Sequence, residues 1–307
     1  MVSDVLVLCT RNRADDVSKC LVSIRTQTRV PRRVLVVDSS DDDATARIVV
    51  DLAQTWAAGS IVDYLWSEPA LTRQRAAGID ATVEDIVHFV DDDTVLDRGY
   101  IEAIDKVFDD DRERAIGGVG GFITDQPAHR FTRIDEILGL DSRSEGTVLP
   151  SGRNVRVYTE PAGPIDVDWL PGCAMSYRRA VFQQERPNVD LGRDRNGEDV
   201  ELSYRVRQHW RLVITPAARI EHHESAEGRR SAEELARIEL LSRYDRVRAR
   251  TGKLSRSAFW LSAFGQLGWY GAKGLITWND ARLAIARETG AAIKQIAARR
   301  SRPARSR

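Results

Sequence analysis

The chain has 307 residues, 42% of them hydrophobic, so it is long enough to bury one large core or one core with an appendage. Lysine and arginine number 46, as do aspartate and glutamate, so the net charge does not favour a nucleic-acid-binding protein. Cys9, Cys20 and Cys173 form no Cys-x-x-Cys pair, which argues against a zinc site and for reduced thiols. No secretory signal precedes the first predicted strand, and we therefore expect a cytoplasmic protein.

Short apolar segments alternate with segments of helical periodicity in the first part of the chain. Strands are predicted at residues 5–8, 34–37, 61–65, 86–90 and 116–123, and helices at 17–24, 44–52, 71–79 and from Tyr100. This alternation is typical of a parallel α/β sheet. The glycines between Ile116 and Ile123 match neither a dinucleotide-binding nor a P-loop pattern, so close backbone packing explains them better.

The remainder contains an irregular segment followed by a helical one. Residues 126–166 are punctuated by glycine and proline, as in a binding loop or a lid. Beyond Glu221 the periodicity is helical. Polar residues interrupt the tryptophan-rich stretch from Phe259 to Trp278, so it is a poor transmembrane span. An interfacial membrane helix and a helix packed on a protein surface are both open alternatives.

The strand predicted at residues 86–90 ends in three consecutive carboxylates, Asp91, Asp92 and Asp93. Their repulsion is unfavourable unless a cation is bound, and ligands of open α/β sheets bind at the carboxyl ends of the strands. Because side chains alternate, Asp91 and Asp93 point to the same side, and Asp92 points away or supports them. Such oxygen ligands suit Mg²⁺ or Mn²⁺ bridged to substrate phosphates. A solvated acidic turn is the simpler alternative.

Further polar side chains lie near the ends of predicted strands and helices. The carboxylate of Asp38 can accept a hydrogen bond from the ring N–H of uracil, thymine or guanine, which cytosine and adenine lack. A helix cap among residues 39–41 is the alternative. Arg73 and Arg75 precede the acidic strand on a predicted helix, and a guanidinium suits phosphate binding. Exposed helix charge would explain either arginine equally well.

Two more pairs of polar residues follow later in the chain. Glu198 and Asp199 begin a predicted helix, where carboxylates are common, but an acceptor hydroxyl that attacks an electrophile also needs a base of this type. His222 and His223 follow a predicted strand. Imidazole is an acceptable ligand for Mn²⁺, although a structural histidine is equally compatible with the sequence.

Taken in order, these motifs resemble the family 2 glycosyltransferases, which have the A-type fold. The resemblance spans about residues 5–223 and rests on segments 9–13, 36–40, 71–79, 91–93, 169–179, 197–205 and 218–223. It implies an α/β fold with a mostly parallel central sheet flanked by helices, and a C-terminal helical appendage. It also implies a catalytic domain at 1–225 that binds nucleotide-sugar and acceptor. Helical periodicity predicts a helical region at 226–297, and the basic composition, low in apolar residues, predicts a disordered tail at 298–307.

The resemblance implies a role for each candidate residue. Asp199 corresponds to the catalytic base, with Glu198 orienting it or the acceptor, and His222 joins Asp91 and Asp93 as a metal ligand. The nucleotide-sugar would be bound by Thr10, Arg11, Arg13, Asp38, Arg73, Arg75, Asp91 and Asp92. The acceptor-side wall would contain Trp169, Gly172 and Met175. The family more often has Ala-Arg-Asn where this chain has Gln-Arg-Ala at 74–76, so either arginine could meet the phosphates.

We therefore expect a metal-dependent, inverting glycosyltransferase that moves a sugar from a UDP, dTDP or GDP sugar to an acceptor hydroxyl, with Mn²⁺ or Mg²⁺ as cofactor. The acceptor would be a sugar, a lipid-linked molecule or a small molecule, for example in cell-envelope glycan or glycolipid synthesis. A nucleotidyltransferase and a non-catalytic carbohydrate- or nucleotide-binding module are the alternatives. A peripheral contact with the inner face of the membrane and a homodimer are compatible with the sequence, and no nucleic-acid partner is expected.

Overall fold

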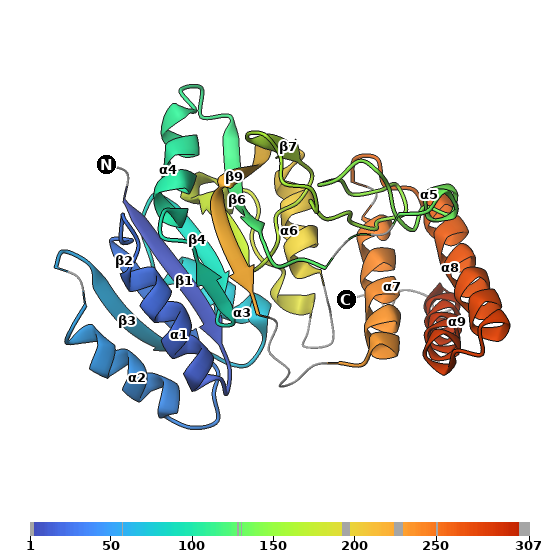
Figure 1. Cartoon of the computed structure of the whole chain (residues 1–307), viewed down its shortest axis with the longest axis horizontal. Helices are drawn as coiled ribbons and strands as arrows, with labels where there is room; N and C mark the ends of the chain where they lie inside the picture. The colour runs from blue at the N-terminus through green and yellow to red at the C-terminus, as the bar shows by residue number, and fades with distance from the viewer. Residues whose placement is uncertain are drawn as a thin grey trace. The chain divides into compact units, whose positions relative to one another are not determined.

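The computed structural model describes residues 3–56, 58–127, 129, 131–191, 197–223, 230–249 and 251–300 (Figure 1). Contacts divide the chain into two compact units. The first contains residues 1–128, 157–193 and 198–225, and the second contains residues 129–156, 194–197 and 226–307. The irregular segment expected to act as a lid therefore packs, over most of its length, in the same unit as the C-terminal helices.

A mixed β-sheet forms the centre of the first unit. Its strands are β1 Asp4–Thr10, β2 Arg33–Asp38, β3 Ile61–Trp66, β4 Ile86–Asp91, β5 Thr94–Leu96, β6 Ile116–Ile123, β7 Ile165–Val167, β8 Ala174–Arg178 and β9 Arg211–His222. They lie in the order β3-β2-β1-β4-β8-β6-β9-β5, with β7 beside β9. Strands β3, β2, β1 and β4 are parallel, and so are β6 and β9, whereas β8 is antiparallel to both β4 and β6. The α/β class is confirmed.

Helices cover both faces of this sheet (Figure 1). They are α1 Ala14–Arg25, α2 Ala44–Ala53, α3 Leu71–Asp80, α4 Tyr100–Asp110 and α6 Glu198–Val206, with 3₁₀ turns at Arg179–Gln183 and Val189–Leu191. Alternation along β1 divides the core: Leu6 and Leu8 pack with α1, α2 and α4, whereas Val5 and Val7 pack with α3 and α6. Parallel strands buried on both faces explain the continuous apolar runs of the sequence.

Strand β6 is rich in glycine because neighbouring side chains pack directly on its backbone. A Cβ at Gly117 would lie 2.5 Å from Cβ of Trp210, and a Cβ at Gly118 would lie 2.8 Å from Cδ1 of Tyr177. Both separations are too short for a real side chain. The predicted explanation, close packing and not phosphate binding, is therefore confirmed at these two positions.

The second unit is helical and contains α5 Arg133–Ile137, α7 Ala232–Arg248, α8 Arg256–Ile276 and α9 Asp280–Arg300. Helix α7 begins with a capping box, in which the Ser231 hydroxyl accepts a hydrogen bond from the backbone N–H of Glu234. Apolar side chains of α7, α8 and α9 form a separate core. Among the residues that the structure describes, no helix has the length and apolar character needed to cross a membrane.

A buried ion-paired cluster fixes the start of β1. Asp4 is 1% exposed, and it accepts hydrogen bonds from Nη1 of Arg29 at 2.9 Å and from the backbone N–H of Arg32 at 3.0 Å. Nε2 of His88 lies 3.5 Å from its Oδ2. Burial alone would raise the pKa of Asp4, but these partners outweigh burial and lower it to about 2. The ionised form is thus favoured in the folded state.

We predict that Asp4→Asn lowers the free energy of unfolding by about 2 kcal/mol near pH 7. Because the folded pKa lies below the usual one, this contribution is present above the unfolded pKa and is lost as the pH falls through the folded one, reaching about half its size near pH 3. Urea unfolding of both proteins at several pH values measures the difference. Asp63→Asn removes a more exposed pair with Arg33 and is the control. A difference independent of pH would contradict the prediction.

Candidate active site

The ends of three neighbouring parallel strands bring polar side chains together. Thr10, Asp38 and Asp91 are the last residues of β1, β2 and β4. In the register of the sheet, Thr10 pairs with Asp38, and Cys9 pairs with Asp91. Carboxyl ends of parallel strands form the binding edge of open α/β sheets. The site predicted from the acidic turn therefore lies at the expected edge.

A short antiparallel pairing adds a histidine to the acidic turn. Strand β5 follows the turn directly, and its Thr94 pairs with His222 at the end of β9. The backbone N–H of His223 donates to the carbonyl of Asp93 at 3.0 Å. Ligand atoms of Asp91, Asp93 and His222 consequently all lie within 4.8 Å of one another. The three residues that sequence motifs suggested as metal ligands form one cluster.

This cluster fits a divalent cation by the chemistry of its donor atoms. Two carboxylates and one imidazole are acceptable ligands for Mn²⁺, and three protein ligands leave positions for phosphate oxygens. Burial raises the pKa of Asp91, although Arg75 and His222 oppose this shift. Burial lowers the pKa of His222, but hydrogen bonds with Asp93 and Cys173 outweigh it and raise the pKa to about 11. A metal that binds here displaces the imidazole proton.

Asp92 has different contacts from its two neighbours. It is buried, and it accepts a hydrogen bond from the Thr10 hydroxyl at 2.6 Å and one from Nη1 of Arg13 at 3.1 Å. Nη1 of Arg13 is also 3.5 Å from Oδ2 of Asp93. Burial raises the pKa of Asp92 to about 6, although the hydrogen bond from Thr10 acts to lower it. Asp92 thus holds Thr10 and Arg13 beside the cluster, in agreement with the supporting position expected from side-chain alternation.

Arg75 connects the acidic turn to α6. Its guanidinium is buried; Nη1 lies 3.0 Å from Oε1 of Glu198, and Nη2 lies 3.5 Å from Oδ1 of Asp91 and 3.2 Å from the carbonyl of Gly172. Arg73 instead lies on the exposed side of α3 and pairs with Glu68. The structure therefore brings Arg75, and not Arg73, to the carboxylate cluster.

Asp199 is held by two backbone N–H groups. Its Oδ2 accepts from Gly172 at 2.9 Å, and its Oδ1 accepts from Val200 at 2.8 Å. A Cβ at residue 172 would lie 2.8 Å from Nη2 of Arg75 and 3.3 Å from Cβ of Asp199, so a larger residue would displace one of them. Burial, together with the charge of Asp199, raises the pKa of Glu198. Both acids begin α6, where the N-terminus of a helix also favours negative charge.

Asp38 is fully buried at the end of β2. Its Oδ1 accepts from the backbone N–H and the hydroxyl of Ser40 at 2.8 and 2.6 Å, and its Oδ2 accepts from the Tyr64 hydroxyl at 3.1 Å. Burial and the neighbouring Asp38 raise the pKa of Tyr64 to about 12. The N-cap of α2 is Asp43, so Asp38 does not cap that helix. Arg11 lies at the surface and pairs with Asp41 at 3.4 Å.

The residues expected to form the acceptor wall are not all accessible. Gly172 lies between Arg75 and Asp199, as described above. Trp169 is 4% exposed. Met175 has no exposed surface, because it lies on β8 in the middle of the sheet and packs in the core with Phe89 and Tyr177. In this structure Met175 therefore does not line a surface.

Gln74, which motif analysis gave no role, joins two strand ends. Its Nε2 donates to the carbonyl of Thr10 at 2.7 Å and to that of Val37 at 2.9 Å. The side chain is buried. The only sequence signal for this role was a polar residue on a side of the helix that is otherwise buried. Gln74 is also the residue at which the chain first departs from the family's usual Ala-Arg-Asn.

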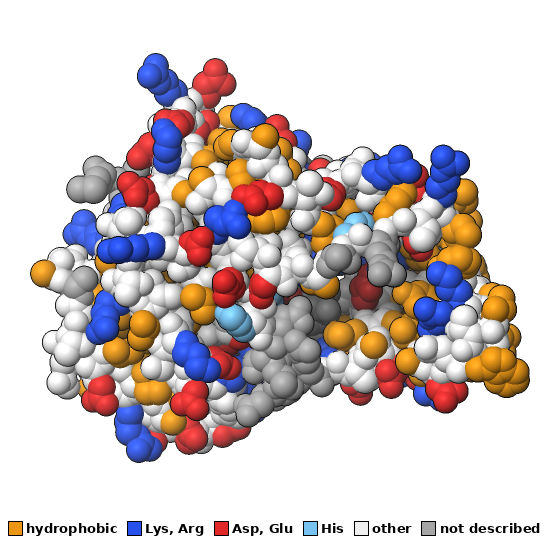
Figure 2. Space-filling view, in the orientation of Figure 1, with side chains coloured by type: hydrophobic (Ala, Val, Ile, Leu, Met, Phe, Trp, Pro, Cys, Tyr) orange, Lys and Arg blue, Asp and Glu red, His pale blue; other side chains and the backbone are white. Residues whose placement is uncertain are grey.

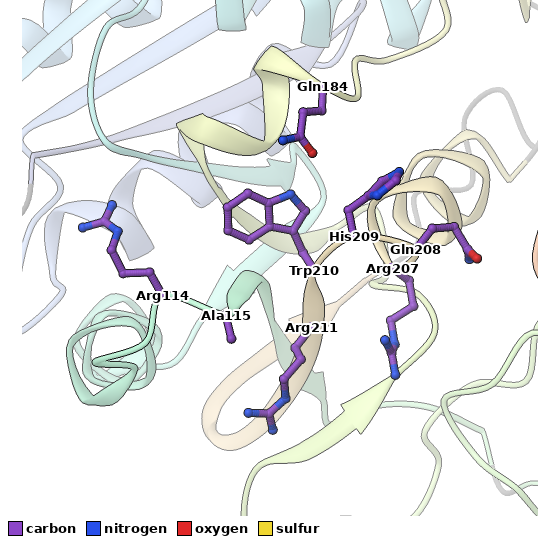
Figure 3. Close-up of a pocket in the computed structure, with 8 residues that line it drawn as sticks. All are labelled: Arg114, Ala115, Gln184, Arg207, Gln208, His209, Trp210 and Arg211. Atoms are coloured by element: carbon purple, nitrogen blue, oxygen red, sulfur yellow. The ribbon is translucent and has the colours of Figure 1, made fainter.

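A separate hollow of about 660 Å³ lies at the other end of β9 from His222. It is lined by Arg114, Ala115, Gln184, Arg207, Gln208, His209, Trp210 and Arg211. Figure 3 shows that the guanidinium groups of Arg114, Arg207 and Arg211 do not converge on one point. Arg211 is paired with Asp166 at 3.1 Å. This hollow is therefore not an assembled site for an anion, and the strand ends remain the candidate site.

Parallel strands whose ends meet an Asp-Asp-Asp turn, followed by the antiparallel β8 and a histidine from β9, define the class: the fold is that of the A-type glycosyltransferases. The mannosyltransferase PcManGT from Pyrobaculum calidifontis, in complex with GDP-Man and Mn²⁺, has a TM-score of 0.59 and 16% identity over 97% of this chain and 75% of that chain. GalNAc-T7 with UDP, GalNAc and Mn²⁺ has a TM-score of 0.58 and 14% identity over 86% of this chain and 54% of its own. S. aureus TarS 1–349 has a TM-score of 0.54 and 15% identity over 89% of this chain and 74% of that chain.

The Glycosyl transferase family 2 model matches residues 5–184, more than half of the chain, and the protein belongs to this family. The family resemblance inferred from the motifs is thus confirmed. No curated protein matches the chain in sequence. The motifs at residues 197–205 and 218–223 lie beyond the matched segment, so the positions of Asp199 and His222 rest on the geometry given above.

We predict that His222→Ala weakens Mn²⁺ binding by at least about tenfold, because it removes one of three clustered ligands. The matched control is His223→Ala, since the neighbouring imidazole is more exposed and pairs with Glu221 outside the cluster. Titration of free Mn²⁺ by electron paramagnetic resonance measures affinity without substrate. Equal affinities for the two variants would exclude His222 as a ligand.

Proposed function

We propose that this glycosyltransferase is metal-dependent and inverting, and that it transfers a sugar from a UDP, dTDP or GDP sugar to an acceptor hydroxyl. The observation that carries the proposal is the Arg75 guanidinium, which contacts Asp91 of the metal-ligand cluster and Glu198 of the Glu-Asp pair at the same time. Family membership supports the reaction class. Fold neighbours in complex with GDP-Man and Mn²⁺, or with UDP, GalNAc and Mn²⁺, support a nucleotide-sugar donor and a divalent ion.

The proposed metal site consists of Asp91, Asp93 and His222. A divalent ion held by these side chains supplies Lewis-acid stabilisation of the diphosphate as negative charge develops on it. Arg13 lies 3.5 Å from Asp93 and contributes a second positive charge at the same edge. Mn²⁺ and Mg²⁺ both suit the oxygen-rich set, and the imidazole favours Mn²⁺.

Asp199 is the proposed general base. The two backbone N–H groups that bind its oxygens fix the plane of the carboxylate, and each oxygen keeps a second lone pair for an acceptor O–H. In the step we propose, the acceptor oxygen bonds to the anomeric carbon, the bond to the diphosphate oxygen breaks, and the acceptor proton moves to Asp199. Attack opposite the leaving group inverts the anomeric centre. Glu198, held by Arg75, positions the acceptor or Asp199.

Asp38 is proposed to select the base of the donor. Asp38 is fully buried beside Ser40 and Tyr64, so a base N–H can reach its carboxylate only if Tyr64 or the 39–41 turn moves. A carboxylate accepts from uracil, thymine or guanine and from neither cytosine nor neutral adenine. Thr10, Arg11 and Arg13 would lie along the donor. Arg73 pairs with Glu68 at the surface of α3, so Arg75 is the better candidate for binding the phosphates.

We also propose that residues 1–225 contain the donor and acceptor sites, and that residues 226–297 form a helical region followed by a basic tail. Trp169 and Gly172 are the proposed acceptor-side residues, and Met175 would contribute through the core beneath them. A sugar, a lipid-linked molecule and a small molecule all present the required hydroxyl. A location on the cytoplasmic side is consistent with three free, buried cysteines.

We predict that Asp199→Asn reduces turnover by about 100- to 10,000-fold while nucleotide affinity stays within about twofold, because the amide cannot take the acceptor proton. Glu201→Gln on the same helix, which loses only a pair with Arg205, is the matched control. Release of nucleoside diphosphate from a panel of UDP, dTDP and GDP sugars reports turnover. Unchanged turnover would reject the base role, and release of pyrophosphate would indicate a nucleotidyltransferase.

We predict that one of UDP, dTDP and GDP binds tightly only when Mn²⁺ is present, and that Asp93→Ala abolishes this binding. Asp93 is a member of the candidate ligand cluster, so its loss would weaken the hold on a divalent ion whose charge would help to bind the diphosphate. Calorimetry with each nucleotide, with and without Mn²⁺, measures the effect, and Asp110→Ala on the exposed side of α4 is the control. If none of the three nucleotides binds, the proposed assignment of the donor site is wrong.

A further inference from the structure

Helix α8 exposes a stripe of apolar residues. Leu261, Phe264 and Leu275 are all exposed, and their spacing places them on one side of the helix. The small residues Ser257, Gly268 and Ala272 complete the same stripe and are also exposed. Figure 2 shows hydrophobic side chains gathered along the outer edge of this helix. No described residue of the chain covers them.

The last residues of α8 and the turn after it extend this apolar surface. Leu275, Ile276 and Trp278 are 68, 78 and 92% exposed, so three large apolar side chains lie close together at the tip between α8 and α9. Trp278 has a positive φ of 49°, a backbone conformation that a bulky residue rarely adopts. Water contact on this scale is unfavourable for apolar side chains, and a contiguous exposed patch of this kind marks an interaction surface.

The opposite side of α8 is buried and mixed in character: Phe259 and Ala263 pack in the core of α7, α8 and α9, and polar residues lie beside them. Ser262 and Gln266 face the interior, where Nη2 of Arg243 donates to the Ser262 hydroxyl at 2.6 Å and Nε2 of Gln266 donates to the Thr289 hydroxyl at 3.1 Å. Arg243 itself is 1% exposed. A helix that packs on a core and faces water normally carries polar residues on its outer side. Helix α8 is apolar on its outer side as well as in the core, which indicates that this outer side faces an apolar medium.

The charge of the sequence around α8 and after Glu288 indicates what kind of partner the exposed stripe binds. Residues 246–279 contain six lysines and arginines and no aspartate or glutamate. The last carboxylate of the chain is Glu288, and six more lysines and arginines follow it. The ammonium of Lys273 lies 3.9 Å from the centre of the Trp269 ring, so a cation sits directly beside aromatic surface. Arg246 is buried, but the excess of positive over negative charge among apolar side chains matches a surface that is apolar below and anionic above.

We propose that the exposed stripe of α8 and the tip Leu275–Trp278 dock on the surface of an anionic lipid bilayer. The helix would lie in the plane of the interface, with its apolar side chains among the acyl chains and its lysines and arginines at the lipid phosphates. Tryptophan favours this depth. A second copy of the chain suits the stripe less well, because a two-fold contact would oppose the same basic surfaces. This inference goes beyond the proposed function and does not depend on it.

The test is flotation of the full chain with vesicles, in the absence of donor and acceptor. One set contains phosphatidylcholine alone, and the other an equimolar mixture with phosphatidylglycerol. The variant Leu275→Ser/Ile276→Ser/Trp278→Ser removes the tip, and its side chains are exposed, so folding is preserved. The matched control, Val50→Ser/Ile61→Ser/Val83→Ser, removes three exposed apolar side chains from the first unit. Thermal unfolding checks that both variants fold.

We expect the native chain and the control to bind the mixed vesicles, with affinity falling as salt is raised, and the tip variant to bind at least about tenfold more weakly. Phosphatidylcholine alone should bind more weakly than the mixture. Absence of binding by the native chain, or equal binding by the tip variant, would overturn the proposal. A dimer that forms in gel filtration and dissociates in the tip variant, without vesicle binding, would assign the surface to a second copy instead.

Discussion

Negative charge gathered at one edge of the sheet is the constraint on which the rest of the structure depends. The acidic turn, Glu198 and Asp199 meet in a largely buried region, where uncompensated carboxylates are strongly unfavourable. Arg75 offsets two of these charges, and Arg13 offsets two more. The guanidinium of Arg75 also binds the carbonyl of Gly172, so the balance of charge fixes the backbone beside Asp199.

This compensation links the acidic turn to the start of α6. Asp91 follows the parallel strands, whereas Glu198 begins a helix more than a hundred residues later, and one side chain contacts both. A metal held at Asp91 would add positive charge next to Arg75 and so weaken the attraction between Asp91 and that guanidinium, leaving Glu198 as its main partner. Under the proposed function, donor binding would then be coupled to the position of Glu198 through Arg75.

Local patterns in the sequence predicted the elements but not the contacts between distant ones. Strands β1 to β4 and helices α1 to α4 follow from apolar periodicity, and the acidic turn follows from its place after a buried strand. The approach of His222 to Asp93 depends on the β5–β9 register, which no local pattern encodes. Likewise, the choice between Arg73 and Arg75 depends on which face of α3 is buried, and Met175 is inaccessible because β8 lies between β4 and β6.

The two units differ in where charged and apolar residues lie. In the first, charge is buried and compensated at the strand ends, whereas in the second, an apolar core of α7, α8 and α9 lies beside the buried Arg243, and further apolar residues of α8 remain outside. Hydroxyl and carbonyl groups bind Nη2 of the buried Arg243, and Ser262 on the inner side of α8 supplies one of them. Phe259 and Ala263 also lie on the inner side, so the exposed apolar residues of α8 are additional to those in the core. A bilayer that covers them would hold the catalytic unit near membrane-bound acceptors and raise their effective concentration through the covalent link alone. Among the three proposed acceptor classes, such docking would favour a lipid-linked hydroxyl.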